Sequence, residues 1–184
     1  RSTEWFAEAL RVTARWCLAF CAAEQLRDYE VNAGEAWIRA GVWIRVGAAP
    51  QFTGDRPGTG AEGIAIAHRE GRKRWNVGGK AAIWTHGFEK HETGPARLHP
   101  TPKPLKLMRE LVRDFSDPGE VIADWHAGSG TTGVAALMEG RRVILVERDP
   151  EHAATCRRRL EETEVGTGTR RAKQLSLLSA GGAR

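Results

Sequence analysis

The chain has 184 residues, of which 41% are hydrophobic and 28% are charged. This composition excludes a wholly disordered chain and suits one compact domain with a packed core. Lysine and arginine outnumber aspartate and glutamate, 28 against 23, which favours a polyanionic partner such as nucleic acid but equally fits an ordinary basic protein.

No apolar stretch is long enough to span a bilayer and no secretory signal opens the chain. We therefore expect no membrane contact and a cytoplasmic location, in a bacterium or a phage-infected cell. The cysteines are odd in number and form no CxxC pair, which argues against a disulfide framework and against a zinc site. Cys17 and Cys21 stand in an apolar run, where buried thiols are the usual finding.

The first half of the chain predicts one helix and three strands. The helix covers about the first 14 residues and begins at Ser2, which can cap it. The apolar run Trp16–Ala22 is typical of a strand buried on both faces of a parallel sheet. A polar, helical stretch leads to about Arg39, and the other two strands are expected at Val42–Val46 and Ile64–His68, with a Gly- and Pro-rich loop between them.

The second half of the chain alternates helices and strands. In order, they are a helix from Pro104 to Phe115, a strand from Val121 to Asp124, a helix at Thr131–Met138, a strand at Arg142–Glu147 and a helix from Pro150 to about Glu162. This alternation predicts an α/β fold: a doubly wound, mostly parallel sheet with helices on both faces and right-handed connections. We expect a domain of residues 1–162 that includes an irregular insertion at residues 69–98, and a flexible basic tail at residues 163–184.

The strongest local signal is a glycine turn in VIADWHAGSGTTG, residues 121–133. A strand ends at Asp124, the turn carries Gly128 and Gly130, and a helix begins near Thr131. Glycines let the backbone approach a ligand, and the start of a helix offers free N–H groups. Glu147, after the next strand, stands where a carboxylate accepts hydrogen bonds from a ribose. The formal GxGxxG pattern also admits a dinucleotide or a purely structural turn.

The second signal is HPTPKP, residues 99–104, directly before a predicted helix. Its prolines stiffen the segment and hold Lys103 as a fixed cation for a carboxylate, with Thr101 as a neighbouring hydroxyl. Alone, the segment fits a rigid surface turn. Together, the two signals describe a pocket with a cation for an amino-acid carboxylate, bare backbone for the middle of a ligand and an acid for a ribose. S-adenosylmethionine has these parts in this order, whereas a dinucleotide needs phosphate contacts instead.

In these motifs the chain resembles the beta class of amino DNA methyltransferases, whose catalytic motif comes first along the chain and whose cofactor motifs come last. HPTPKP, AGSGTT and VILVERDP carry the resemblance, and residues 41–68 are similar to the middle strands of phage- and prophage-type members. The resemblance implies a Rossmann-like methyltransferase fold in permuted motif order, and relatives with this order often form homodimers. The residues implied for S-adenosylmethionine binding are His99, Thr101, Lys103, Asp124, Trp125, His126, Ala127, Gly128, Ser129, Gly130, Thr131 and Glu147.

Two departures from the family pattern stand out. Trp125 and His126 follow Asp124 where the family usually has Pro and an aromatic residue, and the flat His126 ring can replace the aromatic wall. The family's catalytic motif is Asp, Ser or Asn, then Pro-Pro and an aromatic residue, but no Pro-Pro pair occurs in this chain. We therefore expect that motif upstream of Arg1 and assign no catalytic residue.

A basic and aromatic segment follows the third predicted strand, at the place where the family has its target-recognition segment. Cations for phosphates with aromatic rings among them suit a DNA surface. The predicted DNA-binding residues are Arg69, Arg72, Lys73, Arg74, Trp75 and Lys80. The alternative is a solvated basic loop with Trp75 and Trp84 packed into the core.

The resemblance implies transfer of a methyl group, without a metal, from S-adenosylmethionine to an exocyclic amino group of a base in double-stranded DNA. Adenine N6 is the commoner product in the family. Two other functions remain open. One is an NAD-type oxidoreductase that uses the GxGxxG pattern, and the other is a DNA-binding module that keeps a relic cofactor fold without catalysis.

Overall fold

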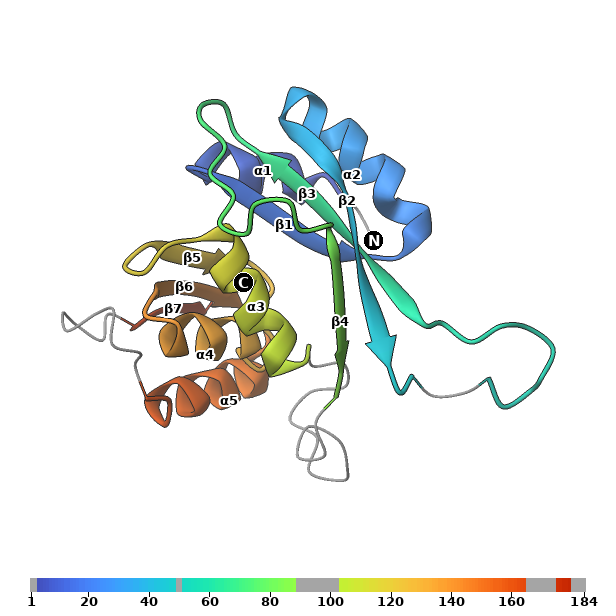
Figure 1. Cartoon of the computed structure of the whole chain (residues 1–184). Helices are drawn as coiled ribbons and strands as arrows, with labels where there is room; N and C mark the ends of the chain where they lie inside the picture. The colour runs from blue at the N-terminus through green and yellow to red at the C-terminus, as the bar shows by residue number, and fades with distance from the viewer. Residues whose placement is uncertain (1–2, 49–50, 89–102, 165–174, 180–184) are drawn as a thin grey trace, which may run out of the picture. The chain divides into compact units, whose positions relative to one another are not determined.

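The computed structural model describes residues 3–48, 51–88, 103–164 and 175–179 (Figure 1). Its contacts divide the chain into two compact units, Arg1–Gly87 and Phe88–Arg184, each with its own sheet. The single methyltransferase domain expected over residues 1–162 stays a prediction.

The first unit combines two helices, two short 3-10 turns and a four-stranded sheet. Its elements are α1 (Trp5–Val12), β1 (Trp16–Cys21), η1 (Ala23–Gln25), α2 (Leu26–Ala33), η2 (Gly34–Ala36), β2 (Trp37–Val46), β3 (Ala61–His68) and β4 (Ile83–Gly87). The sheet order is β1-β3-β2-β4. β3 is antiparallel to both of its neighbours and β4 is parallel to β2. The carboxyl ends of β1, β2 and β4 therefore lie at one edge of this sheet.

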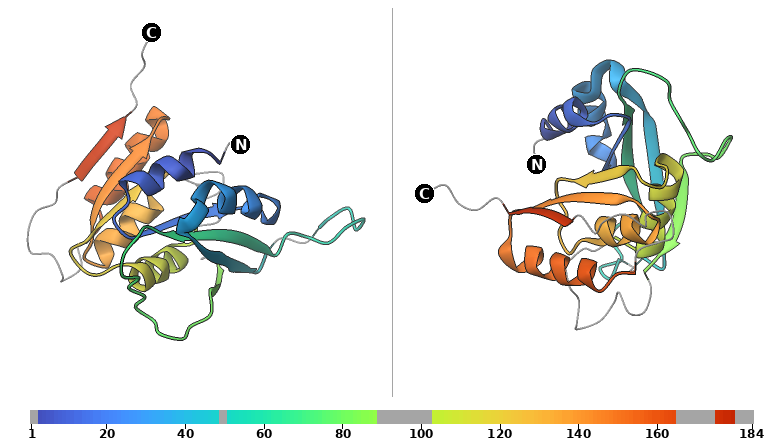
Figure 2. Two further views of the ribbon diagram at one scale, coloured as in Figure 1. Left: turned by 90° about the horizontal axis from the view of Figure 1, so that it is seen from above. Right: turned by 90° about the vertical axis from the view of Figure 1, so that its left-hand side faces the viewer.

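Helices α1 and α2 pack against each other on one face of this sheet (Figure 2). Helix α1 has an apolar face, with Phe6, Ala9 and Leu10 buried. Phe6 meets the rings of Trp5 and Tyr29 edge-on, at centroid distances of 5.7 and 5.1 Å, an arrangement that aromatic pairs favour. This aromatic cluster fixes α1 on α2.

The second unit is a parallel sheet with helical connections. Its elements are α3 (Leu105–Phe115), β5 (Val121–Asp124), α4 (Thr131–Met138), β6 (Arg142–Glu147), α5 (Pro150–Glu161) and β7 (Leu175–Ser179). The sheet order is β5-β6-β7, and both pairs are parallel. α4 contacts β5 and β6, α5 contacts β6 and β7, and α3 packs on α4. The predicted helices and strands between Pro104 and Glu162 are confirmed to within one residue at their ends.

Three predictions about the first half of the chain are wrong. β1 is not a doubly buried parallel strand, because its residues alternate between buried and half-buried and it pairs antiparallel with β3. β2 begins at Trp37, inside the stretch expected to be helical, and β3 begins at Ala61, inside the expected loop. Hydrogen bonding across the sheet overrides the local polarity of these strand ends. Ser2, the expected helix cap, lies outside the described residues.

Two further strands lie in segments for which none was expected. β4 falls inside the expected irregular insertion, and β7 falls inside the expected flexible tail. In β4, Trp84 is 1% exposed, and a Cβ atom added to Gly41 on β2 would lie 2.9 Å from its ring. Trp84 therefore packs directly on the bare backbone of Gly41, as expected for this residue under the alternative to a DNA surface.

Replacing Trp84 with alanine should lower the free energy of unfolding by about 3–5 kcal/mol, because it empties a large buried site. Ile83→Ala is the matched control on the same strand, since Ile83 is 51% exposed, and it should cost less than about 1 kcal/mol. Urea unfolding followed by circular dichroism measures both. Equal losses would contradict the assignment of β4 to the core.

Candidate functional site

The candidate site lies at the carboxyl ends of β5 and β6. These strands are parallel neighbours, with Asp124 opposite Leu145, so the segments that follow them emerge side by side. After Asp124 the chain makes a turn and enters α4 at Thr131. The Ala127 amide donates to the Val146 carbonyl at 3.0 Å, which ties this turn to the end of β6. In open α/β sheets this edge is where ligands bind.

Hydrogen bonds within the turn fix its shape. The His126 amide donates to Asp124 Oδ1 at 2.9 Å, and the Gly130 amide donates to the Ala127 carbonyl at 2.8 Å. Gly128 and Gly130 have φ angles of 53° and 83°, in the left-handed region that favours glycine. The glycines predicted to bend the backbone here do so.

Glu147 faces the turn. Its Oε2 accepts from the Gly128 amide at 2.7 Å, and its Oε1 accepts from the Asp149 amide at 2.8 Å. Each carboxylate oxygen has a second lone pair, so the group can still accept hydrogen bonds from a ligand. The structure thus brings together the glycine turn and the acid that the sequence pairs with it.

The back of the turn rests on α5. A Cβ atom at Gly130 would lie 2.5 Å from Sγ of Cys156, so no side chain fits there. Burial raises the pKa of the Cys156 thiol to about 11, and the thiol is therefore a neutral packing group near pH 7. Gly133, one turn into α4, packs as closely on Leu145 and Leu160.

Ser129 and Thr131 are buried, with 3% and 7% of their surface exposed. The guanidinium of Arg159 on α5 donates to the hydroxyl groups of both. Sequence reasoning missed Arg159, because it stands in a run of three arginines, Arg157 to Arg159, that resembles any solvated helix face.

The predicted lysine segment is described only at its end. His99 and Thr101 lie outside the described residues, whereas Lys103 is half-buried and Pro104 is fully buried at the start of α3. The far end of α3 leads into β5, and there the Gly119 amide donates to the Gly140 carbonyl at 2.8 Å, beside the start of β6. Because α3 ends near the amino ends of the strands, it begins toward their carboxyl ends, where the turn lies.

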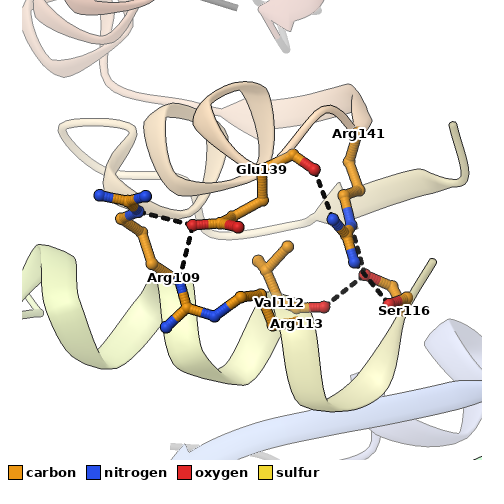
Figure 3. Close-up of polar contacts among 6 residues, drawn as sticks. All are labelled: Arg109, Val112, Arg113, Ser116, Glu139 and Arg141. Atoms are coloured by element: carbon orange, nitrogen blue, oxygen red, sulfur yellow. Dashed lines mark hydrogen bonds and ion pairs between the residues drawn. The ribbon is translucent and has the colours of Figure 1, made fainter. Parts of the chain in front are cut away.

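Charged contacts hold α3 on α4 in this direction (Figure 3). Glu139 Oε1 accepts from Arg109 Nε and from Arg113 Nη1, both at 2.7 Å. Arg141 is 5% exposed, and its Nη2 donates to the Ser116 carbonyl at 2.5 Å while Nη1 donates to the Glu139 carbonyl. Burial lowers the pKa of Arg141, and nearby Glu139 opposes that shift. The buried charge is tolerated because backbone carbonyls satisfy it.

The amino end of α4 directly follows the glycine turn. Its first residue follows Gly130, whose side-chain-free position provides no capping hydrogen bond. The first amides of a helix have no partner within the helix and carry its positive dipole end, which favours polar or anionic ligand groups. Trp125 is half-buried and His126 is exposed on the loop before it.

Most of the predicted DNA-binding residues follow β3, at the edge of the first unit's sheet where β1 and β2 begin. Arg69, Arg72, Lys73 and Arg74 are exposed and follow the end of β3. The Trp16 indole donates to the Arg74 carbonyl at 2.7 Å, which holds this segment beside the start of β1. This basic segment therefore lies at the amino ends of the parallel strands β1 and β2, not at their carboxyl ends.

The two remaining predicted residues of that segment contact aromatic rings. Trp75 is half-buried, and its ring centroid lies 6.3 Å from that of Trp16. The Lys80 ammonium lies 5.3 Å from the centroid of the Trp84 ring. At the carboxyl edge, the loop after β2 instead presents Phe52, which is 87% exposed and which the sequence did not single out.

Comparison with known proteins identifies the family. The family model N6_N4_Mtase, described as DNA methylase, matches residues 56–158, more than half of the chain. The chain belongs to this family of DNA methylases. It is 38% identical over 79 residues to the type II methyltransferase M2.DpnII of Streptococcus pneumoniae, covering 43% of this chain and 30% of that protein. It is 40% identical over 63 residues to the DNA adenine methyltransferase YhdJ of Escherichia coli K12, covering 34% and 21%. The chain thus spans less than a third of each of these curated relatives.

Among solved structures, the M1.HpyAVI–SAM complex matches with a TM-score of 0.71 at 25% identity, over 85% of this chain and 80% of that one. The predicted Rossmann-like α/β methyltransferase fold is confirmed. In the part of the chain that the structure describes, no helix has the length and apolarity needed to cross a membrane, and no three His, Cys, Asp or Glu side chains are grouped to hold a metal ion.

Replacing Gly130 with alanine should destabilise the protein through both backbone strain and overlap with Cys156. Gly119→Ala is the matched control, because Gly119 has a similar φ of 87° but no atom within 4 Å of an added Cβ. We expect a loss of about 1 kcal/mol at Gly119 and about 1–3 kcal/mol more at Gly130.

Urea unfolding of both variants checks this expectation. A Cys156→Ala background should reduce the loss at Gly130 and leave the loss at Gly119 unchanged. An unchanged loss at Gly130 would show that Cys156 does not restrict the turn.

Proposed function

We propose that this chain is the S-adenosylmethionine-binding portion of a DNA methyltransferase that acts on an exocyclic amino group, adenine N6 in the first instance. The observation that carries the proposal is the Glu147 carboxylate held 2.7 Å from the Gly128 amide at the carboxyl ends of two parallel strands. Comparisons lend no support to an NAD-type oxidoreductase or to a non-catalytic DNA-binding module.

The residues at this edge suit the cofactor's parts. The turn lacks a side chain at Gly128, so a flat or bulky ligand can approach its backbone there. The Glu147 carboxylate accepts hydrogen bonds from the ribose hydroxyl groups. Asp124 and His126 flank the turn. Lys103, at the start of α3, is the cation for the methionine carboxylate. When bound, S-adenosylmethionine supplies an electrophilic methyl group, and these residues orient it.

The partner that we propose is double-stranded DNA, met in the cytoplasm of a bacterium or a phage-infected cell. The YhdJ relative is named as a DNA adenine methyltransferase, which supports adenine as the target. A homodimer is the assembly that we propose from the motif order. No residue of this chain is proposed as the methyl-transfer catalyst.

Glu147→Ala should weaken S-adenosylmethionine binding by about 10- to 100-fold, because it removes a charged acceptor for the ribose. Titration calorimetry on the 184-residue chain measures the dissociation constant. Glu162→Ala removes the same charge from an exposed position beyond α5, and it should leave binding unchanged.

NAD(H) serves as the competing ligand in the same titrations. Binding of NAD(H) in preference to S-adenosylmethionine, or equal effects of the two substitutions, would contradict the proposed function.

The DNA contact of the basic segment has its own test. Removing Arg72, Lys73 and Arg74 together should weaken binding similarly on all DNA sequences and reduce the salt slope by roughly 2–3, about 0.9 for each lost phosphate contact. Fluorescence anisotropy at several salt concentrations measures both quantities. The matched control removes three exposed arginines elsewhere, Arg27, Arg157 and Arg158. A lost sequence preference with an unaltered slope, or equal effects of both triple variants, would remove this segment from the DNA interface.

A further inference from the structure

Arg159 approaches the glycine turn from the side of α5. The helix that carries it is firmly placed at its start, where the Asp149 side chain accepts from the Glu151 and His152 amides at 2.9 and 3.0 Å and Pro150 occupies the first turn. Cys156, one turn before Arg159, touches Gly130 from the same helix. The guanidinium therefore reaches the turn from a rigid base.

One nitrogen of Arg159 makes three contacts with the glycine turn. Its Nη1 lies 2.7 Å from the Ser129 carbonyl oxygen, 3.0 Å from the Ser129 hydroxyl and 3.2 Å from the Thr131 hydroxyl. The shortest distance is to the carbonyl, and hydrogen bonds from a charged donor are shorter and stronger than neutral ones. The main bond thus fixes the peptide group between Ser129 and Gly130.

The same contacts turn two side chains inward. With 3% and 7% of their surface exposed, Ser129 and Thr131 offer little to a ligand, and both hydroxyl groups accept from Arg159. Ser129 and Thr131 were expected to contact the cofactor, but their hydroxyl groups face the protein.

We propose that Arg159 is a positioning residue that holds the glycine turn in its binding conformation, and that Ser129 and Thr131 act as its acceptors. This inference rests on the proposed function and deepens it. Two of the turn's residues are glycines, which lose the most conformational freedom when they are ordered. A turn that is already fixed spares the ligand this ordering cost, so the clamp raises affinity without touching the ligand.

The test is a double-mutant cycle on S-adenosylmethionine affinity. Arg159→Met keeps the apolar stem and removes the donors, and we expect binding about tenfold weaker, the equivalent of about 1.4 kcal/mol. Ser129→Ala with Thr131→Val removes the two hydroxyl acceptors, and we expect a smaller loss of about threefold. Combined with Arg159→Met, this pair should add nothing, because residues in one network are not additive.

Matched variants separate positioning from general damage. Arg157→Met removes an exposed arginine from the same helix and should not change affinity. Arg159→Lys keeps the charge and should recover part of the loss. Hydrogen exchange of the amides at residues 128–131, measured without ligand, should be faster in Arg159→Met and unchanged in Arg157→Met.

The outcomes distinguish failure of the proposed function from failure of the inference about Arg159. If the unaltered chain does not bind S-adenosylmethionine, the proposed function fails, whereas the exchange measurement still reports on the clamp. If the unaltered chain binds and Arg159→Met binds equally well, the inference is overturned. Additive losses in the cycle would also overturn it, because the hydroxyl groups would then act on the ligand independently. If Arg159→Met does not fold, the Ser129 and Thr131 variants and Arg159→Lys still decide.

Discussion

The second unit depends on the absence of side chains at two glycines. Gly130 lies against Cys156, and Gly133 lies against Leu145 and Leu160, so β6, α4 and α5 approach one another more closely than any larger residue allows. This close approach puts the end of β6 beside the turn, and only then does the Gly128 amide reach the Glu147 carboxylate. The requirement for bare backbone at Gly130 and Gly133 is thus structural. A glycine pattern that sequence alone leaves ambiguous between packing and binding has a packing role here, and its binding role is the proposal made above.

A second set of contacts orients α3 relative to this turn. Arg141 is buried, and an isolated charge there would be costly, but Ser116 and the Glu139 carbonyl accept its hydrogen bonds. The Glu139 side chain makes a second link between α3 and α4, because it accepts from Arg109 and Arg113 (Figure 3). Arg113 and Arg141 join the end of α3 to the end of α4, and Arg109 joins the middle of α3 to the same place. These contacts hold α3 in position and with it Lys103 at its start, so substitutions in them would act on the proposed cofactor site through the position of the helix.

The sequence predicted most of the second unit and less of the first. Strands and helices between Pro104 and Glu162 were readable because each has its own period and is bounded by Gly, Pro or Asp. The first unit was harder, since β3 is a long-range antiparallel partner of both β1 and β2, and apolar runs do not reveal strand direction. β4 was missed because its residues are short of apolar periodicity, and its burial depends on Trp84 meeting Gly41. At the site, the turn and Glu147 were predicted but Arg159 was not. In the sequence, an arginine that contacts the turn cannot be told from the solvated arginines beside it on α5.

Strand direction also decides how the basic segment relates to DNA. β3 lies between β1 and β2 and is antiparallel to both. The residues after His68 therefore leave the sheet at the amino ends of β1 and β2. β4, parallel to β2, then carries the chain back to the carboxyl edge. The loop after β2, with its exposed Phe52, lies at that second edge. Composition alone predicted DNA contact for the segment with the most cations, and that segment lies at the opposite edge. The proposed role of Arg72, Lys73 and Arg74 is attraction of the phosphate backbone, which cations provide without reading a base.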